Sequence, residues 1–145
     1  MVNTIYRTDF YQWTVAQADH LRNEEYAELD VPNLIDEIEA MAAKERRELT
    51  IRLARIMEHL LKLTCEPRSK AVRGWQQSIE DQRLELEVLL AENATLRMRV
   101  DDFIPNAYKI ALRLANGKMK CKVEDFPSAC AWTAAQMLDL DWLPG

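Results

Sequence analysis

The chain has 145 residues, of which 48% are hydrophobic and 30% are charged, and its formal net charge at pH 7 is −5. A chain of this length is expected to form a single domain that spans residues 1–145. No apolar run approaches the roughly 20 residues that cross a membrane. The N-terminus also lacks the basic and apolar regions of a signal peptide. We therefore expect a cytoplasmic protein with no membrane partner.

Charge is distributed unevenly along the chain. Residues 1–43 contain nine acids and two bases, whereas residues 44–73 contain four acids and nine bases. The negative net charge disfavours nucleic acid as a partner without excluding it, because a local basic surface can still attract phosphates. Alternating segments of opposite sign most simply indicate helices that attract one another inside a bundle.

The first predicted helix begins after Thr8 or Asp9 and runs to about Glu25. Asp9 and Gln12 stand at the spacing of a capping box. The following link, residues 26–29, is short, so this helix is expected to lie antiparallel against the first half of the next one. Its expected inner face consists of Phe10, Trp13, Gln17 and Leu21.

The longest helical pattern lies between Asp30 and Pro67. Asp30 and Pro32 are start signals, and Pro67 favours an end near Cys65. Apolar residues at spacings of three and four predict one stripe along this helix. We expect the whole stripe to be buried: Leu34, Ile38, Met41, Leu49, Leu53, Ile56, Leu60 and Leu63.

The rest of the chain also has a helical period. A third helix is predicted from about residue 71 or 75 to Ala91, and a short C-terminal helix follows a cap at Thr133 and ends at about Leu140. The predicted fold class is all-α, an antiparallel helical bundle of four main helices around one long central helix, plus the short C-terminal helix.

The fourth main helix is predicted from Ala94 to Ala115, with Asn93 as its N-cap. Pro105 lies inside this pattern. Because proline lacks a backbone N–H and its ring meets the carbonyl four residues earlier, the helix should kink or divide near residues 102–104.

A polar row runs beside the apolar stripe of the long helix and consists of Glu45, Glu48, Arg52, Arg55, His59 and Lys62. Folding the third helix back brings a second polar interruption, Gln82 and Arg83, opposite this row. In one interpretation the row is a solvated face whose i, i+4 pairs contribute a few tenths of a kcal/mol each. In the other it is a buried polar site, because a buried acid costs several kcal/mol unless it is paired. The predicted contacts are Glu45 and Glu48 with Arg52 and Arg83, Gln82 with the remaining hydrogen-bonding groups, and His59 with Trp75.

The three cysteines, Cys65, Cys121 and Cys130, are odd in number and form no Cys-x-x-Cys pair. This pattern indicates neither a disulfide framework nor a zinc site. We expect three reduced thiols.

The sequence contains no complete metal or nucleotide motif. A carboxylate-bridged di-metal bundle requires Glu-x-x-His on two helices, and Gln17 and Ile56 stand where those glutamates would precede His20 and His59. There is no phosphate loop, Gly-x-Ser-x-Gly or HExxH. We expect no metal site and no cofactor.

One low-specificity catalytic pattern remains. Arg52, six residues and His59 together resemble the motif of helical nucleotide-binding ribonucleases, in which the histidine is the acid or base and the arginine stabilises a phosphate. Leu53 replaces the polar residue that usually follows the arginine, and helical rise alone separates the pair by about 10 Å. Glu48 is the third catalytic candidate.

Several stretches together resemble a known family. They are DFYQWTVAQADHLR, LDVPNLIDEIEAMAAKERREL, EHLLKL followed by CEP, GWQQSIEDQR, and FPSACAWTAAQMLDLDWLP. The chain is similar, end to end, to the bacterial family catalogued as domain of unknown function 29, which is common in cyanobacteria. The resemblance implies an all-helical, single-domain, intracellular bacterial protein, and it brings no activity with it.

The sequence therefore leaves two functions open. The first is a macromolecular binding or regulatory partner without catalysis of its own, whose partner is another protein or a second copy of the chain. The alternative is a metal-independent, ribonuclease-like protein that uses Arg52 and His59.

Overall fold

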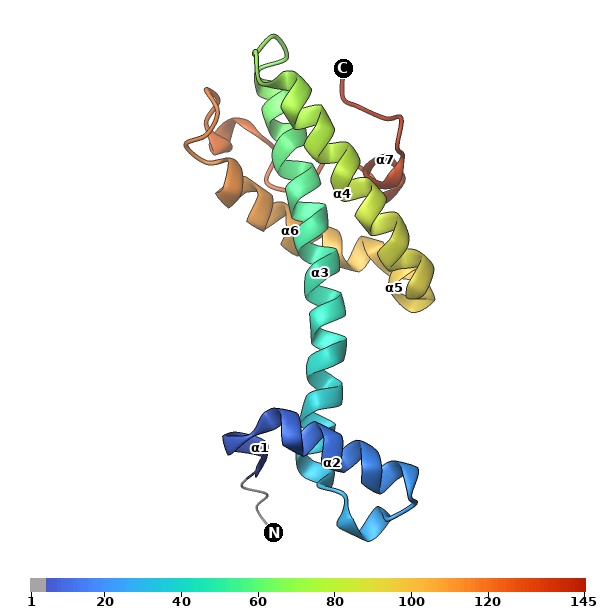
Figure 1. Cartoon of the computed structure of the whole chain (residues 1–145). Coiled ribbons are helices and arrows are strands. Elements are labelled where there is room, and N and C mark those ends of the chain that lie inside the picture. Colours follow the sequence, from blue (N-terminus) through green and yellow to red (C-terminus); the bar gives the residue numbers. More distant parts are fainter. Residues whose placement is uncertain (1–4) are drawn as a thin grey trace. The chain divides into compact units, whose positions relative to one another are not determined.

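The computed structural model describes residues 5–145, in which helices are the only regular secondary structure (Figure 1). The predicted all-α bundle with one long central helix is confirmed. In chain order the elements are α1 (Ile5–Thr8), α2 (Phe10–Arg22), η1 (Tyr26–Glu28), α3 (Val31–Cys65), α4 (Val72–Glu92), α5 (Ala94–Met98), α6 (Val100–Ala115), η2 (Val123–Asp125) and α7 (Ala134–Leu138).

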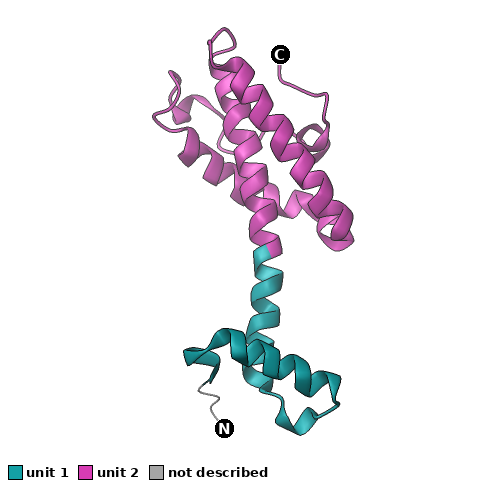
Figure 2. Cartoon of the chain, in the orientation of Figure 1, with its two compact units in different colours: residues 1–44 teal, residues 45–145 magenta. Residues whose placement is uncertain are grey.

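Two compact units make up the chain, residues 1–44 and 45–145 (Figure 2). We call them unit 1 and unit 2. Helix α3 belongs to both, because its bounds, Val31 and Cys65, lie on either side of the division. The expectation of a single domain over residues 1–145 stays a prediction.

In unit 1, α2 is tied to the start of α3 by polar contacts around one tryptophan. Asp9 caps α2 as predicted, since its carboxylate accepts a hydrogen bond from the backbone N–H of Gln12 at 3.0 Å. The buried Trp13 donates its indole N–H to Asp30 at 2.9 Å, and the buried Gln17 accepts the Asp30 backbone N–H at 2.8 Å. These bonds satisfy polar groups that burial would otherwise leave unpaired.

The predicted inner face of α2 is only half correct. Trp13 and Gln17 are buried, but Phe10 and Leu21 are each about half exposed. The helix also ends at Arg22, three residues early, because Glu24 takes a left-handed backbone conformation with a φ of 58° that a right-handed helix cannot contain.

In unit 2, the second half of α3 is surrounded by α4, α6 and the C-terminal segment (Figure 1). The predicted stripe is buried here, and it continues into a core that spans all of these elements. Trp132 and Trp142 of the C-terminal segment pack against this core. Its fully covered large side chains are Leu49, Leu53, Ile56, Met57, Leu60, Leu61, Ile79, Leu86 and Met137.

The fourth predicted helix divides, but not where Pro105 indicated. The break falls at Arg99, between α5 and α6, and the backbone is helical from Val100 through Pro105 to Ala115. Because α6 starts only five residues before the proline, Pro105 removes one hydrogen bond near the N-terminus of the helix. The expected division near residues 102–104 is thus three residues too late.

The prediction of three reduced thiols is wrong. Cys65, the last residue of α3, forms a disulfide with Cys121, and their Cα atoms are 5.9 Å apart. Only Cys130 is a free thiol among the described residues. Burial raises the pKa of the Cys130 thiol, although a smaller backbone contribution from Trp132 opposes that shift.

Candidate functional site

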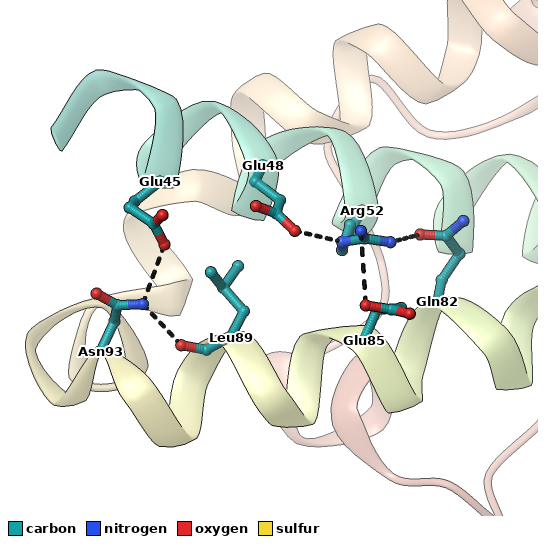
Figure 3. A network of polar contacts seen from close by, with 7 residues as sticks. All are labelled: Glu45, Glu48, Arg52, Gln82, Glu85, Leu89 and Asn93. Carbon is teal, nitrogen blue, oxygen red and sulfur yellow. Dashed lines mark hydrogen bonds and ion pairs between the residues drawn. The ribbon is translucent and has the colours of Figure 1, made fainter. Parts of the chain in front are cut away.

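Arg52 is the centre of a polar network between α3 and α4 (Figure 3). Its Nε lies 3.1 Å from a carboxylate oxygen of Glu48, one turn earlier on α3, and its Nη1 donates to the Gln82 amide oxygen at 3.1 Å. A longer ion pair of 3.7 Å joins it to Glu85 of α4. The Arg52 side chain is 25% exposed and that of Glu85 is 60% exposed, so water screens these charges and each exposed pair contributes little.

Glu45 belongs to the same side of α3, but its partner is Asn93. The Asn93 amide donates to the Glu45 carboxylate at 3.1 Å and to the Leu89 carbonyl at 2.9 Å (Figure 3). Asn93 occupies the predicted N-cap position of α5 without capping that helix through its side chain. It instead joins the end of α4 to the start of the α3 segment in unit 2.

Arg83 does not meet Glu45 or Glu48, which corrects the predicted cluster. Its side chain is 2% exposed and turns to the C-terminal segment, where it donates to three backbone carbonyls. Nε donates to Met137 at 2.8 Å, Nη1 to Trp142 at 2.7 Å and Nη2 to Gln136 at 3.0 Å. Burial lowers the pKa of the guanidinium, and the charge of Asp139 acts in the opposite direction.

His59 contacts its own helix. Its Nδ1 lies 2.8 Å from the backbone carbonyl of Arg55, one turn earlier. No hydrogen bond in the described part of the chain joins His59 to Trp75, which is half buried and packs against the core of unit 2. The predicted pairing of these two rings therefore has no polar contact to support it.

A second ionic cluster lies further along α3. The buried carboxylate of Glu58 accepts from Lys62 at 3.0 Å and from Arg55 at 3.2 Å. Burial alone would raise the pKa of Glu58, but the hydrogen bond and charge of Lys62, with smaller contributions from His59 and Arg55, hold that pKa below its ordinary value. This cluster keeps an acid ionised inside the bundle.

These contacts limit the chemistry of the polar row. Arg52 is already paired with two carboxylates, and no hydrogen bond or ion pair among residues 5–145 links it to His59. No group of three or more His, Cys, Asp or Glu side chains within that range could hold a metal ion.

The first half of α3 presents a different kind of surface. Three large apolar residues of the predicted buried stripe or its edge are open to solvent there: Ile38 is 63% exposed, Met41 is 68% exposed and Ile35 is about half exposed. Val31 is also half exposed, and Leu34 is only partly covered. We call these five residues the α3 apolar face. The expectation that this part of the stripe is buried is wrong.

Comparison with known families now places the chain. A family model described as domain of unknown function DUF29 matches residues 5–143. The chain belongs to the DUF29 family. No curated protein and no solved structure matches it. No helix among the described residues of this DUF29 protein is long and apolar enough to cross a membrane.

Sequence reasoning missed several residues of this DUF29 chain that the structure brings together. Glu58 has Arg55 three residues before it and Lys62 four residues after it, a spacing that predicts ion pairs on one helix. The Arg83 acceptors are backbone carbonyls, which no side-chain pattern reveals. The solvent exposure of Ile38 depends on which other segments reach it, so the residue pattern within α3 could not reveal it.

Proposed function

We propose that this protein is a bacterial binding or regulatory partner of another macromolecule, without catalysis of its own. The α3 apolar face carries this proposal. An exposed side chain of isoleucine or methionine is ordinary when it is isolated, but contiguous exposed residues at helical spacing are typical of an interaction surface. Ile35, Ile38 and Met41 meet that description.

The polar row adds indirect support. Arg52 and His59, the residues of the ribonuclease alternative, are each engaged by groups of unit 2 itself. A catalytic pair would need a free cation beside a free ring nitrogen within reach of one phosphate. The contacts of Arg52 with Glu48 and Glu85 oppose that requirement.

Affinity capture tests the proposal with the full chain as bait in extracts of the organism that makes it. Ile38→Ser removes an exposed apolar side chain from the α3 apolar face. Ile51→Ser is the matched control, because Ile51 is a 42% exposed isoleucine of the same helix outside that face. We expect one set of macromolecules to be retained by the native chain and by Ile51→Ser, and lost by Ile38→Ser.

The same preparations distinguish the alternative. RNA is incubated with the native chain and with His59→Gln in the presence of a chelator. If the native chain cleaves RNA without metal and His59→Gln does not, the protein is a ribonuclease and the proposed binding function is wrong. An unchanged set of captured macromolecules for Ile38→Ser would also reject the α3 apolar face as the binding surface.

A further inference from the structure

The α3 apolar face has the geometry of a helix-binding ridge. Val31, Leu34, Ile35 and Ile38 stand at i, i+3, i+4 and i+7, and Met41 continues the series by another turn. With a rise of about 1.5 Å per residue, the ridge is roughly 15 Å long. A ridge at this spacing fits between the side chains of a second helix, and amphipathic helices are recognised through the same spacing.

The neighbouring side of α3 is already covered within unit 1. The Asp30 carboxylate accepts a hydrogen bond from the Trp13 indole N–H, and the Glu37 carboxylate accepts one from the Tyr6 hydroxyl. Glu37 immediately precedes Ile38, and successive residues of a helix are separated by about 100° around its axis. Tyr6 of α1 and Trp13 of α2 therefore lie on the flank that carries Asp30 and Glu37. The ridge is exposed except at Leu34, which is partly covered.

Charge around the ridge selects the partner. Between Val31 and Ala43 there are three acids and no Lys or Arg. Glu37 is bound by Tyr6, whereas Asp36 and Glu39 are exposed and have no ion-pair partner among the described residues. Residues 1–43 as a whole contain nine acids and two bases. A partner with bases on its flanks would neutralise this charge, while a second unit 1 would place acid beside acid.

We infer that the α3 apolar face binds an amphipathic helix of another protein, one whose apolar stripe is flanked by Lys or Arg. This inference rests on the proposed function and adds the chemistry of the partner. Apolar burial along the ridge supplies the attraction, and Glu39 and Asp36 favour a basic helix over an acidic one. A second copy of the chain is disfavoured by the same acids.

Two synthetic helical peptides test the inference. They share one leucine stripe, and their flanking positions are all lysine in one and all glutamate in the other. Fluorescence anisotropy of each labelled peptide is measured against the native full-length protein. We expect the lysine peptide to bind at least about tenfold more tightly, and added salt to reduce that difference, because exposed charges are screened.

Variants of the full chain locate the binding site. Ile38→Ser should weaken binding of the lysine peptide about tenfold or more, whereas Ile51→Ser should change it less than about twofold. Glu39→Lys should weaken it several-fold. Glu80→Lys, which makes the same charge change at an exposed position of α4, should have a smaller effect.

Each contrary outcome has a distinct meaning. Equal binding of the two peptides, with Ile38→Ser weakening both, would overturn the basic partner and leave the proposed function intact. Failure of both peptides to bind would overturn the inference. If Ile38→Ser also left the captured macromolecules unchanged, the proposed function would fail with it. A dimer in sedimentation that Ile38→Ser dissociates would identify a second copy as the occupant and reject a basic helix.

Discussion

Replacement of Arg83 by alanine should destabilise unit 2 by about 3 kcal/mol. Its three hydrogen bonds, of 2.7 to 3.0 Å, are made by a charged donor, and each such bond contributes about 1.5–3 kcal/mol. Their sum, roughly 4.5–9 kcal/mol, is offset by the several kcal/mol that it costs to bury a guanidinium without a carboxylate. For a chain of this size the change corresponds to a fall in Tm of roughly 10 °C.

Urea denaturation followed by circular dichroism would measure this loss. Arg83→Lys should be intermediate, because an ammonium group lacks the planar fork that reaches Gln136, Met137 and Trp142 together. Arg73→Ala is the matched control on the exposed surface of α4, and it should change the free energy of unfolding by less than about 0.5 kcal/mol. A loss below about 1 kcal/mol for Arg83→Ala, or full stability of Arg83→Met, would refute the reasoning.

Three further perturbations have defined outcomes. Reduction, or Cys121→Ser, should lower the free energy of unfolding by about 4 kcal/mol, because the disulfide restricts the unfolded chain by joining residues 56 apart in sequence. Three titratable thiols in the native protein would contradict the pairing. Glu58 has a lowered folded-state pKa, so its contribution to stability is complete above its unfolded pKa of about 4.5 and disappears as the pH falls through the folded value. The free energy of unfolding should therefore fall less steeply in acid for Glu58→Gln than for the native chain. Parallel curves for the two proteins would contradict a stabilising role of the cluster. His59→Gln should shift the unfolding free energy by less than about 0.5 kcal/mol and leave captured macromolecules unchanged, since Nδ1 of His59 lies against the Arg55 carbonyl of its own helix. A lost partner would make His59 part of the binding site.

Some helix bounds were predictable because local signals determine them. Asp9, Asp30, Pro67 and Thr133 each act within a turn or so of their own position, and the structure begins or ends helices beside all four. Residue Arg99 has no comparable signal, and there the prediction failed.

Burial was harder to predict than helicity. The stripe of α3 has the same spacing at Ile38 as at Leu53, yet the first is open and the second is fully covered. Whether an apolar residue is buried depends on which other segments reach it, and those segments are distant in sequence. The Cys65–Cys121 pair has the same difficulty, since no motif connects positions 56 residues apart.

The hydrogen bonds of Arg83 form only after a much later part of the chain has been synthesised. Its acceptors follow it by 53 to 59 residues, so at roughly 5–20 residues per second the ribosome supplies them about 3–12 s after the arginine itself. During that interval the guanidinium lacks these three acceptors, and the core of unit 2 lacks Met137, which the folded chain buries completely. Residues 136–142 thus complete the core of unit 2 last, and a nascent chain that stalls before them exposes apolar surface to chaperones and proteases.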